Sequence, residues 1–116
     1  MNELEKIRLR IRQFAADRDW DQFHSPKNLS MALAAESGEL LEQFQWLTEK
    51  QSKELSDEKL HDIEEELADI QIYLIRLADK LNINIIDAVH KKIEVNEKKY
   101  PADKVKGSAK KYDEYE

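Results

Sequence analysis

Cysteine is absent from this chain of 116 residues, and glycine and proline occur only twice each. Without cysteine, neither a disulfide framework nor a thiolate metal site is possible. The scarcity of helix-breaking residues, together with 38% charged residues, favours a single all-α domain. No apolar run approaches the ~18 residues of a membrane span, and the N-terminus has no signal-peptide pattern. We therefore expect a cytoplasmic protein that makes no membrane contact.

An excess of basic residues is also lacking, since the formal net charge is −6. Duplex nucleic acid is bound nonspecifically through a basic face, so we expect no DNA or RNA partner. An acidic protein can still take a polyanionic ligand when metal ions neutralise the contact.

Hydrophobic periodicity and capping residues predict four helices. The expected helices are residues 2–18, 26–47, 57–81 and 85–100, with a loop at 48–55. Ser25 before Pro26, Ser56 or Asp57, and Asn84 are the expected N-terminal caps. The expected core stripes of the second and third helices are Leu29, Leu33, Leu40, Phe44 and Leu47, and Ile63, Leu67, Ile70, Leu74, Leu77 and Leu81. Ile72 and Ile75 lie off the second of these stripes, which indicates a further apolar face at a subunit interface.

Two acidic pairs flank these stripes: Glu36 with Glu39, and Glu66 with Asp69. Each pair is spaced i, i+3, so its carboxylates lie on one side of a helix turn. Either pair alone is ordinarily a solvated surface feature. Four carboxylates gathered beside a core would repel one another and lose hydration. The oxygen-only ligand set therefore predicts a hard divalent cation such as Mg²⁺.

Aromatic and basic residues suggest the rest of a ligand site. The loop holding Trp20, Phe23 and His24, with Trp46 and Tyr73, is compatible with a base-stacking pocket, although most aromatics in a small domain are core. The polar and basic residues of the last helix could hold phosphates, or could simply complement the helix dipole. These residues are Lys92, Asn96 and Lys99.

Rival chemistries lack support in the sequence. Glu58 with His61, and Asp87 with His90, have a spacing used by di-iron bundles, but both pairs face away from the apolar stripes. A Ser/His/Asp arrangement, a Gly-rich phosphate loop and an HExxH motif are all absent.

Several motifs together carry a family resemblance. They are Glu36-Ser-Gly-Glu39 and Glu66-Leu-Ala-Asp69, the runs FAADRDWDQFHSPKNL, GELLEQFQW and EEELADIQIYL, the K-x-x-x-N-x-x-K-Y-P pattern at 92–101, and the terminal GSAKKY. In this combination the chain resembles the MazG-like all-α nucleoside triphosphate pyrophosphatases, and in particular their dCTP pyrophosphatase branch. Lys99 stands where relatives often have Arg, which weakens a bidentate phosphate contact.

The resemblance implies a fold and an activity. The fold would be a four-helix MazG-like bundle completed by oligomerisation, as a dimer or a dimer of dimers, with the domain at residues 1–103 and a flexible tail at 104–116. The reaction would be Mg²⁺-dependent hydrolysis of a deoxynucleoside triphosphate between its α- and β-phosphates, to the monophosphate and pyrophosphate, with dCTP preferred and nucleotide-pool house-cleaning as its role.

The resemblance also implies roles for individual residues. Metal-binding and catalytic positions correspond to Glu36, Glu39, Glu66 and Asp69; base and sugar positions to Trp20, His24, Trp46 and Tyr73; phosphate positions to Lys92, Asn96 and Lys99. Two alternatives stay open: a non-catalytic helical module that binds nucleotide or protein, and a relative that acts on dUTP or a noncanonical base. The number of metal ions, the general base and the ordering of the tail on a ligand are not determined by the sequence.

Overall fold

The computed structural model describes residues 1–108, and its regular elements are all helical. In chain order they are α1 (Glu3–Asp17), the 3₁₀ turn η1 (Asp21–Phe23), α2 (Pro26–Phe44), α3 (Glu49–Ser52), α4 (Asp57–Lys80), α5 (Ile85–Lys99) and α6 (Ala102–Val105). The predicted all-α class and the four long helices are confirmed.

The predicted caps begin the long helices. The side chain of Ser25 accepts a hydrogen bond from the amide of Asn28, with Pro26 at the first turn of α2. Ser56 starts α4 and Asn84 starts α5 in the same way. Each cap satisfies an amide that has no partner within its helix. These short polar residues therefore set three helix starts, as the sequence predicts.

The predicted end of the second helix and the loop after it are wrong. Helix α2 stops at Phe44 rather than Leu47, and the expected loop at 48–55 contains α3. The cause is a capping box, in which the side chain of Thr48 accepts from the amide of Gln51 and the side chain of Gln51 accepts from the amide of Thr48. This reciprocal pair nucleates a new turn immediately after α2.

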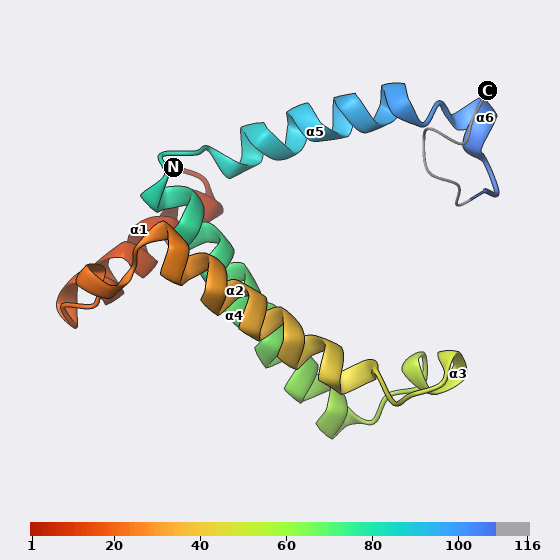
Figure 1. The fold of residues 1–116 in the computed structure, drawn as a ribbon, viewed down its shortest axis with the longest axis horizontal. Coiled ribbons are helices and arrows are strands. Elements are labelled where there is room, and N and C mark those ends of the chain that lie inside the picture. The colour runs from red at the N-terminus through yellow and green to blue at the C-terminus, as the bar shows by residue number, and fades with distance from the viewer. Residues whose placement is uncertain (109–116) are drawn as a thin grey trace. The chain divides into compact units, whose positions relative to one another are not determined.

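Residues 1–82 form one compact unit built on the pairing of α2 and α4. The two helices run antiparallel and side by side (Figure 1). Helix α1 packs against α4 at the end where α2 begins and α4 finishes. The most deeply buried apolar residues of this unit are Ala15, Leu29, Ile63, Ile75 and Ala78.

Two expectations about the faces of α4 are wrong. Ile75, expected on an outer face, is only 2% exposed, whereas Leu67, expected in the core stripe, is 53% exposed. Helix α1 packs on the C-terminal part of α4, where Arg8 and Arg12 bind Asp79. That part of α4 has two neighbours and buries a second face. Leu67 lies in the half that pairs with α2 alone, so its side chain stays open, and Leu81 at the helix end is likewise exposed.

Residues 83–116 form a second unit, described to residue 108. Helix α5 ends before Pro101, which has no backbone N–H to continue a helix. Ile86, Val89 and Ile93, which helical periodicity would place on the inner face of this helix, are exposed. The predicted boundary of a tail at 104–116 stays a prediction: Val105 still belongs to the short α6, and residues 109–116, with most of the GSAKKY run, lie outside the described part.

Within residues 1–108, none of the helices combines the length and the apolar character that crossing a membrane requires.

The packing makes a direct prediction about Leu29, which is 1% exposed on α2. Replacing Leu29 by Ala removes buried methyl groups and leaves a cavity, so the free energy of unfolding should fall by about 2–5 kcal/mol. Urea denaturation followed by circular dichroism measures this change. Met31 lies two residues away but is 53% exposed. Its replacement by Ala should cost less than about 0.5 kcal/mol, and equal losses in the two variants would contradict this assignment of the core.

Candidate functional site

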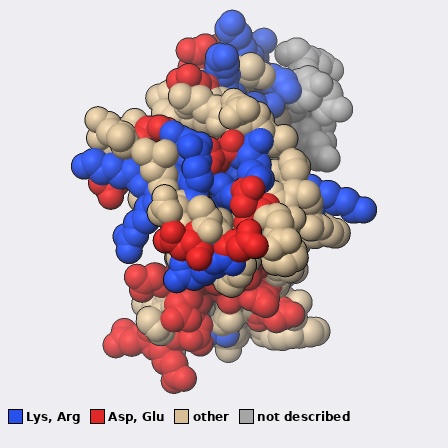
Figure 2. All heavy atoms as spheres, turned by 90° about the vertical axis from the view of Figure 1, so that its left-hand side faces the viewer, with Lys and Arg blue, Asp and Glu red and all other residues tan. Residues whose placement is uncertain are grey.

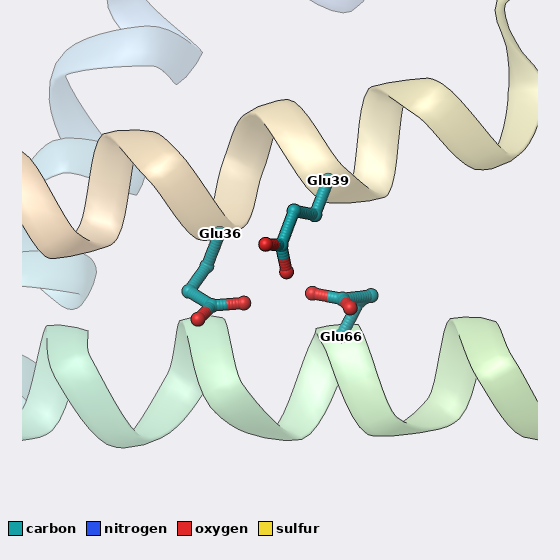
Figure 3. A group of neighbouring side chains, drawn as sticks. All are labelled: Glu36, Glu39 and Glu66. Atoms are coloured by element: carbon teal, nitrogen blue, oxygen red, sulfur yellow. The ribbon is translucent and has the colours of Figure 1, made fainter.

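Three acidic side chains meet between α2 and α4. Glu36 and Glu39, one turn apart on α2, point toward Glu66 on α4 (Figure 3). One carboxylate oxygen from each lies within 4.8 Å of the others. Glu36 and Glu66 are partly buried, whereas Glu39 is exposed. We call these three residues the acidic cluster.

Two oxygens of the acidic cluster have no partner. Glu36 Oε2 and Glu66 Oε2 are buried, and within the described residues neither accepts a hydrogen bond. Burial first, and then the neighbouring Glu66 and Glu39, raise the pKa of Glu36 to about 7. The pKa of Glu66 is raised as well: its hydrogen bond with Glu36 acts to lower it, but burial and the charges of Glu39 and Asp69 outweigh that bond. Buried polar atoms are normally satisfied, so this arrangement calls for a positive ligand.

The donor set of the acidic cluster fits a hard divalent cation. Such ions are held by carboxylate oxygens, and carboxylates from facing helices are a common way to build their sites. A cation bound by Glu36, Glu39 and Glu66 would satisfy the two buried oxygens and relieve the repulsion that contributes to the raised pKa values of Glu36 and Glu66.

Asp69 links the acidic cluster to a neighbouring cavity. Its charge contributes to the raised pKa values of Glu36 and Glu66, although it is not one of the three converging residues. It lines a cavity of about 230 Å³ within the first unit. Pockets that enclose a whole drug-sized ligand measure ~300–1,000 Å³, so this cavity suits a part of a ligand such as a nucleobase. Its other lining residues are Ile11, Phe14, Ala15, Trp20, His24, Ile72, Tyr73 and Arg76.

The loop after α1 holds the aromatic side of this cavity. Trp20 packs edge-to-face on Phe14 of α1, with ring centroids 5.7 Å apart and an interplanar angle of 74°. The guanidinium of Arg18 lies over the Phe14 ring, 3.6 Å from the ring centroid. These contacts orient Trp20 against the end of α1. The structure thus brings three of the predicted base-site residues to one cavity: Trp20, His24 and Tyr73.

The other predicted ligand residues follow the end of α2 or belong to α5. Trp46 follows the end of α2 and is 86% exposed, and it does not line the cavity. Lys92, Asn96 and Lys99 are exposed on α5, which belongs to the second unit. Their expected phosphate contacts stay a prediction.

Sequence reasoning missed a charge network beside the cavity. Arg76 of α4 is only 3% exposed, and it donates to Asp21, Asp79 and the ring of His24. The signal was present, because a basic residue interrupts the apolar run 72–78 with an aspartate three residues later. Almost no charged side chain is fully buried unless it is paired.

Helix α1 and Lys80 complete this network. Arg8 and Arg12 donate to Asp79 over 2.7 and 2.6 Å, and Lys80 donates to Asp21 over 2.7 Å. These hydrogen bonds hold the pKa values of both aspartates below the usual range. Arg12 has the largest effect on the pKa of Asp79, and Lys80 has the largest effect on that of Asp21. Figure 2 shows basic and acidic side chains interleaved on the face that carries α1. The network ties α1, the loop and α4 together next to the cavity.

The family follows from comparison with known proteins. The sequence model of the MazG-like family matches residues 31–115, which include α2 from Met31 onward and the whole of α4, with the acidic cluster. The chain belongs to the MazG-like family.

Named relatives place the similarity more narrowly. Human dCTP pyrophosphatase 1 is 42% identical over 113 residues, which cover 96% of this chain and 66% of the human protein. The mouse protein of the same name is 43% identical over 111 residues, covering 94% and 65%. The chain thus spans just under two thirds of the length of these relatives. The predicted resemblance to this branch is confirmed.

A solved structure shows the same fold. The crystal structure of a pyrophosphatase from Archaeoglobus fulgidus superposes with a TM-score of 0.82 at 40% identity. The match covers 87% of this chain and 94% of the archaeal one. The arrangement of helices described above is therefore the MazG-like fold.

The raised pKa of Glu36 predicts how stability depends on pH when metal is absent. Between the ordinary value of 4.5 and about 7, the folded protein holds a proton on Glu36 that the unfolded chain releases. The contribution of Glu36 to the free energy of unfolding therefore falls as pH rises through this window. Glu36→Gln cannot ionise, so it should be more stable than the wild type at pH 7.5 and lose this advantage at pH 5.

Urea denaturation in EDTA at the two pH values measures this difference. The pKa of His24 is lowered, chiefly by burial, and its effect on stability runs in the opposite direction. That effect is present in both proteins and cancels when they are compared. A difference between wild type and variant that does not change with pH would contradict the assignment.

Proposed function

We propose that this protein is a Mg²⁺-dependent pyrophosphohydrolase of deoxynucleoside triphosphates, with dCTP as its preferred substrate. It would cleave between the α- and β-phosphates and release the monophosphate and pyrophosphate. The observation that carries the proposal is the acidic cluster, with its two partnerless buried oxygens, beside a cavity lined by aromatic residues. The similarity to proteins named dCTP pyrophosphatase 1 and to a solved pyrophosphatase supports it.

The carboxylates of α2 and α4 carry the first part of the mechanism. Glu36, Glu39, Glu66 and Asp69 would hold the Mg²⁺. The ion would offset the negative charge of the triphosphate and act as a Lewis acid. Glu39 is the exposed member of the acidic cluster. We assign it as the group that accepts a proton from the attacking water. The new bond joins this water oxygen to the α-phosphorus, and the bond to the pyrophosphate leaving group breaks.

The aromatic cavity carries the second part. Trp20 and Tyr73 offer ring faces for a base, and His24 offers a polar contact. Its volume of about 230 Å³ supports a single base as the occupant, with the sugar and phosphates extending toward Asp69 and the acidic cluster. A preference for dCTP over dUTP or a noncanonical nucleotide rests on the names of the relatives.

The remaining ligand contacts are assigned by the resemblance alone. Lys92, Asn96 and Lys99 of α5 are assigned to the phosphates, and Trp46 to the base or sugar, as the resemblance implies. The apolar side chains of Ile86, Val89 and Ile93 are exposed in the single chain, which supports a homo-oligomer, a dimer or a dimer of dimers. A cytoplasmic role in removing surplus nucleotides belongs to the same proposal.

The test is a nucleotide panel with product identification. Purified protein is incubated with each dNTP, including dUTP, with and without Mg²⁺, and the products are separated by ion-exchange chromatography. Monophosphate and pyrophosphate in equal amounts are expected, with dCTP fastest and no turnover in EDTA. Orthophosphate with a diphosphate would contradict the cleavage site, and no turnover of any nucleotide would contradict the enzyme.

Matched variants then test the residues. Glu39→Gln and Asp69→Asn keep side-chain volume but remove a charge, so turnover should fall more than about a hundredfold with the fold intact. Glu42→Gln removes an exposed charge from the same helix as Glu39 and should leave turnover unchanged. Equal effects of Glu39→Gln and Glu42→Gln would contradict the assigned site.

A non-catalytic helical module that binds nucleotide or another protein is the second candidate, and the exposed apolar residues of α5 offer a surface for another protein. Calorimetry distinguishes the two. Heat of binding for dCTP with Mg²⁺, without product formation over many hours, would favour the module.

A further inference from the structure

Arg76 makes a contact that its charge network does not require. Its Nη2 donates to Asp21 over 2.6 Å and its Nη1 to Asp79 over 3.4 Å, while its Nε donates to Nδ1 of His24 over 3.2 Å. Asp79 and Asp21 have other cationic partners in Arg8, Arg12 and Lys80. Within the described residues, the imidazole of His24 has a hydrogen bond only with Arg76.

The chemistry of the donor determines the state of the acceptor. A guanidinium is always charged in proteins and has N–H donors but no acceptor. The Nδ1 atom that receives its Nε–H must therefore carry a lone pair and no proton. The remaining proton of a neutral imidazole then lies on Nε2. Burial of His24, and secondarily the charge of Arg76, lower the pKa of the imidazole, whereas Asp21 acts in the opposite direction and Lys80 adds to the lowering.

The position of His24 gives this state a consequence. The residue lines the aromatic cavity, and Arg76 occupies Nδ1, so Nε2 is the ring nitrogen left for a ligand. We propose that Arg76 is a positioning residue that holds His24 as the neutral Nε2–H tautomer, so that the cavity offers a fixed hydrogen-bond donor to an acceptor atom of the bound nucleobase. This inference rests on the proposed function for its ligand, but the tautomer itself does not depend on any ligand.

A fixed donor selects its ligand. A base that places a carbonyl oxygen or an unprotonated ring nitrogen at Nε2 gains a hydrogen bond. A base that places an N–H there leaves two donors facing each other, which costs more than the absence of a bond. Because Arg76 is buried and tied to Asp21, the imidazole cannot turn over to expose Nδ1 without breaking a buried contact. Arg76 would thus act on specificity through the imidazole of His24.

The direct test reads the tautomer by NMR of the ¹⁵N-labelled full chain without nucleotide. Long-range ¹H–¹⁵N spectra distinguish the two neutral tautomers from the imidazolium, and His24→Gln assigns the signals against those of His61 and His90. We expect a protonated Nε2 and an unprotonated Nδ1 for His24 at pH 7.5. An Nδ1–H tautomer or an imidazolium would overturn the proposal whether or not the protein turns over nucleotides.

The variant Arg76→Met removes the donor and leaves Asp79 paired with Arg8 and Arg12 and Asp21 paired with Lys80. His24 should then show a mixture of protonation states, and KM for dCTP should rise about fivefold to tenfold while kcat changes less than twofold. Arg12→Met is the matched control, since Arg12 shares Asp79 but does not contact His24. It should leave the His24 spectrum and KM unchanged.

The outcomes separate the two ideas. Unchanged His24 signals or an unchanged KM in folded Arg76→Met would overturn the positioning role. If the wild type bound no nucleotide, the proposed function would fail, and the His24 spectra of wild type and Arg76→Met would still decide whether Arg76 sets the tautomer.

Discussion

The acidic cluster between α2 and α4 is the constraint on which the rest of the structure depends. Helix pairing brings Glu36 and Glu66 into a space where each leaves one buried oxygen without a partner. Such groups destabilise a fold unless a ligand neutralises them. Without a cation, the two oxygens therefore lower the stability of the protein at neutral pH. The proposed cation would satisfy both oxygens at once and so stabilise the folded state.

The apolar packing of α2 and α4 supports this unfavourable arrangement. Leu29 and Ile63 are buried in the same unit, and Ile75 and Ala78 add a second buried face where α1 joins α4. Hydrophobic burial is not directional, so it can hold two helices at a spacing that their charges would oppose. Functional residues are commonly maintained at such a cost to local stability.

The charge network around Arg76 has a different role from that of the apolar packing. Burying ion pairs contributes little net stability, because lost hydration offsets the attraction. A buried guanidinium instead fixes the orientation of its partners, since its donors have a fixed geometry. Here those donors join α4 to the loop carrying Asp21 and His24, at the cavity and within the same unit as the acidic cluster. The acidic cluster and the aromatic cavity are thus positioned by two distinct kinds of interaction.

The sequence by itself determined the four long helices, three of their caps, and the pairs Glu36/Glu39 and Glu66/Asp69, because these depend on spacing within a few residues. Its motifs also carried the resemblance to the family. Only the tertiary structure decided which oxygens are buried without partners, that Ile75 is core and Leu67 exposed, and that Arg76 contacts His24 across 52 positions of the chain. Periodicity finds the apolar side of a helix, but it does not tell how many neighbours cover that helix along its length. The faces of α4 and the partner of His24 depended on where α1 and the loop pack.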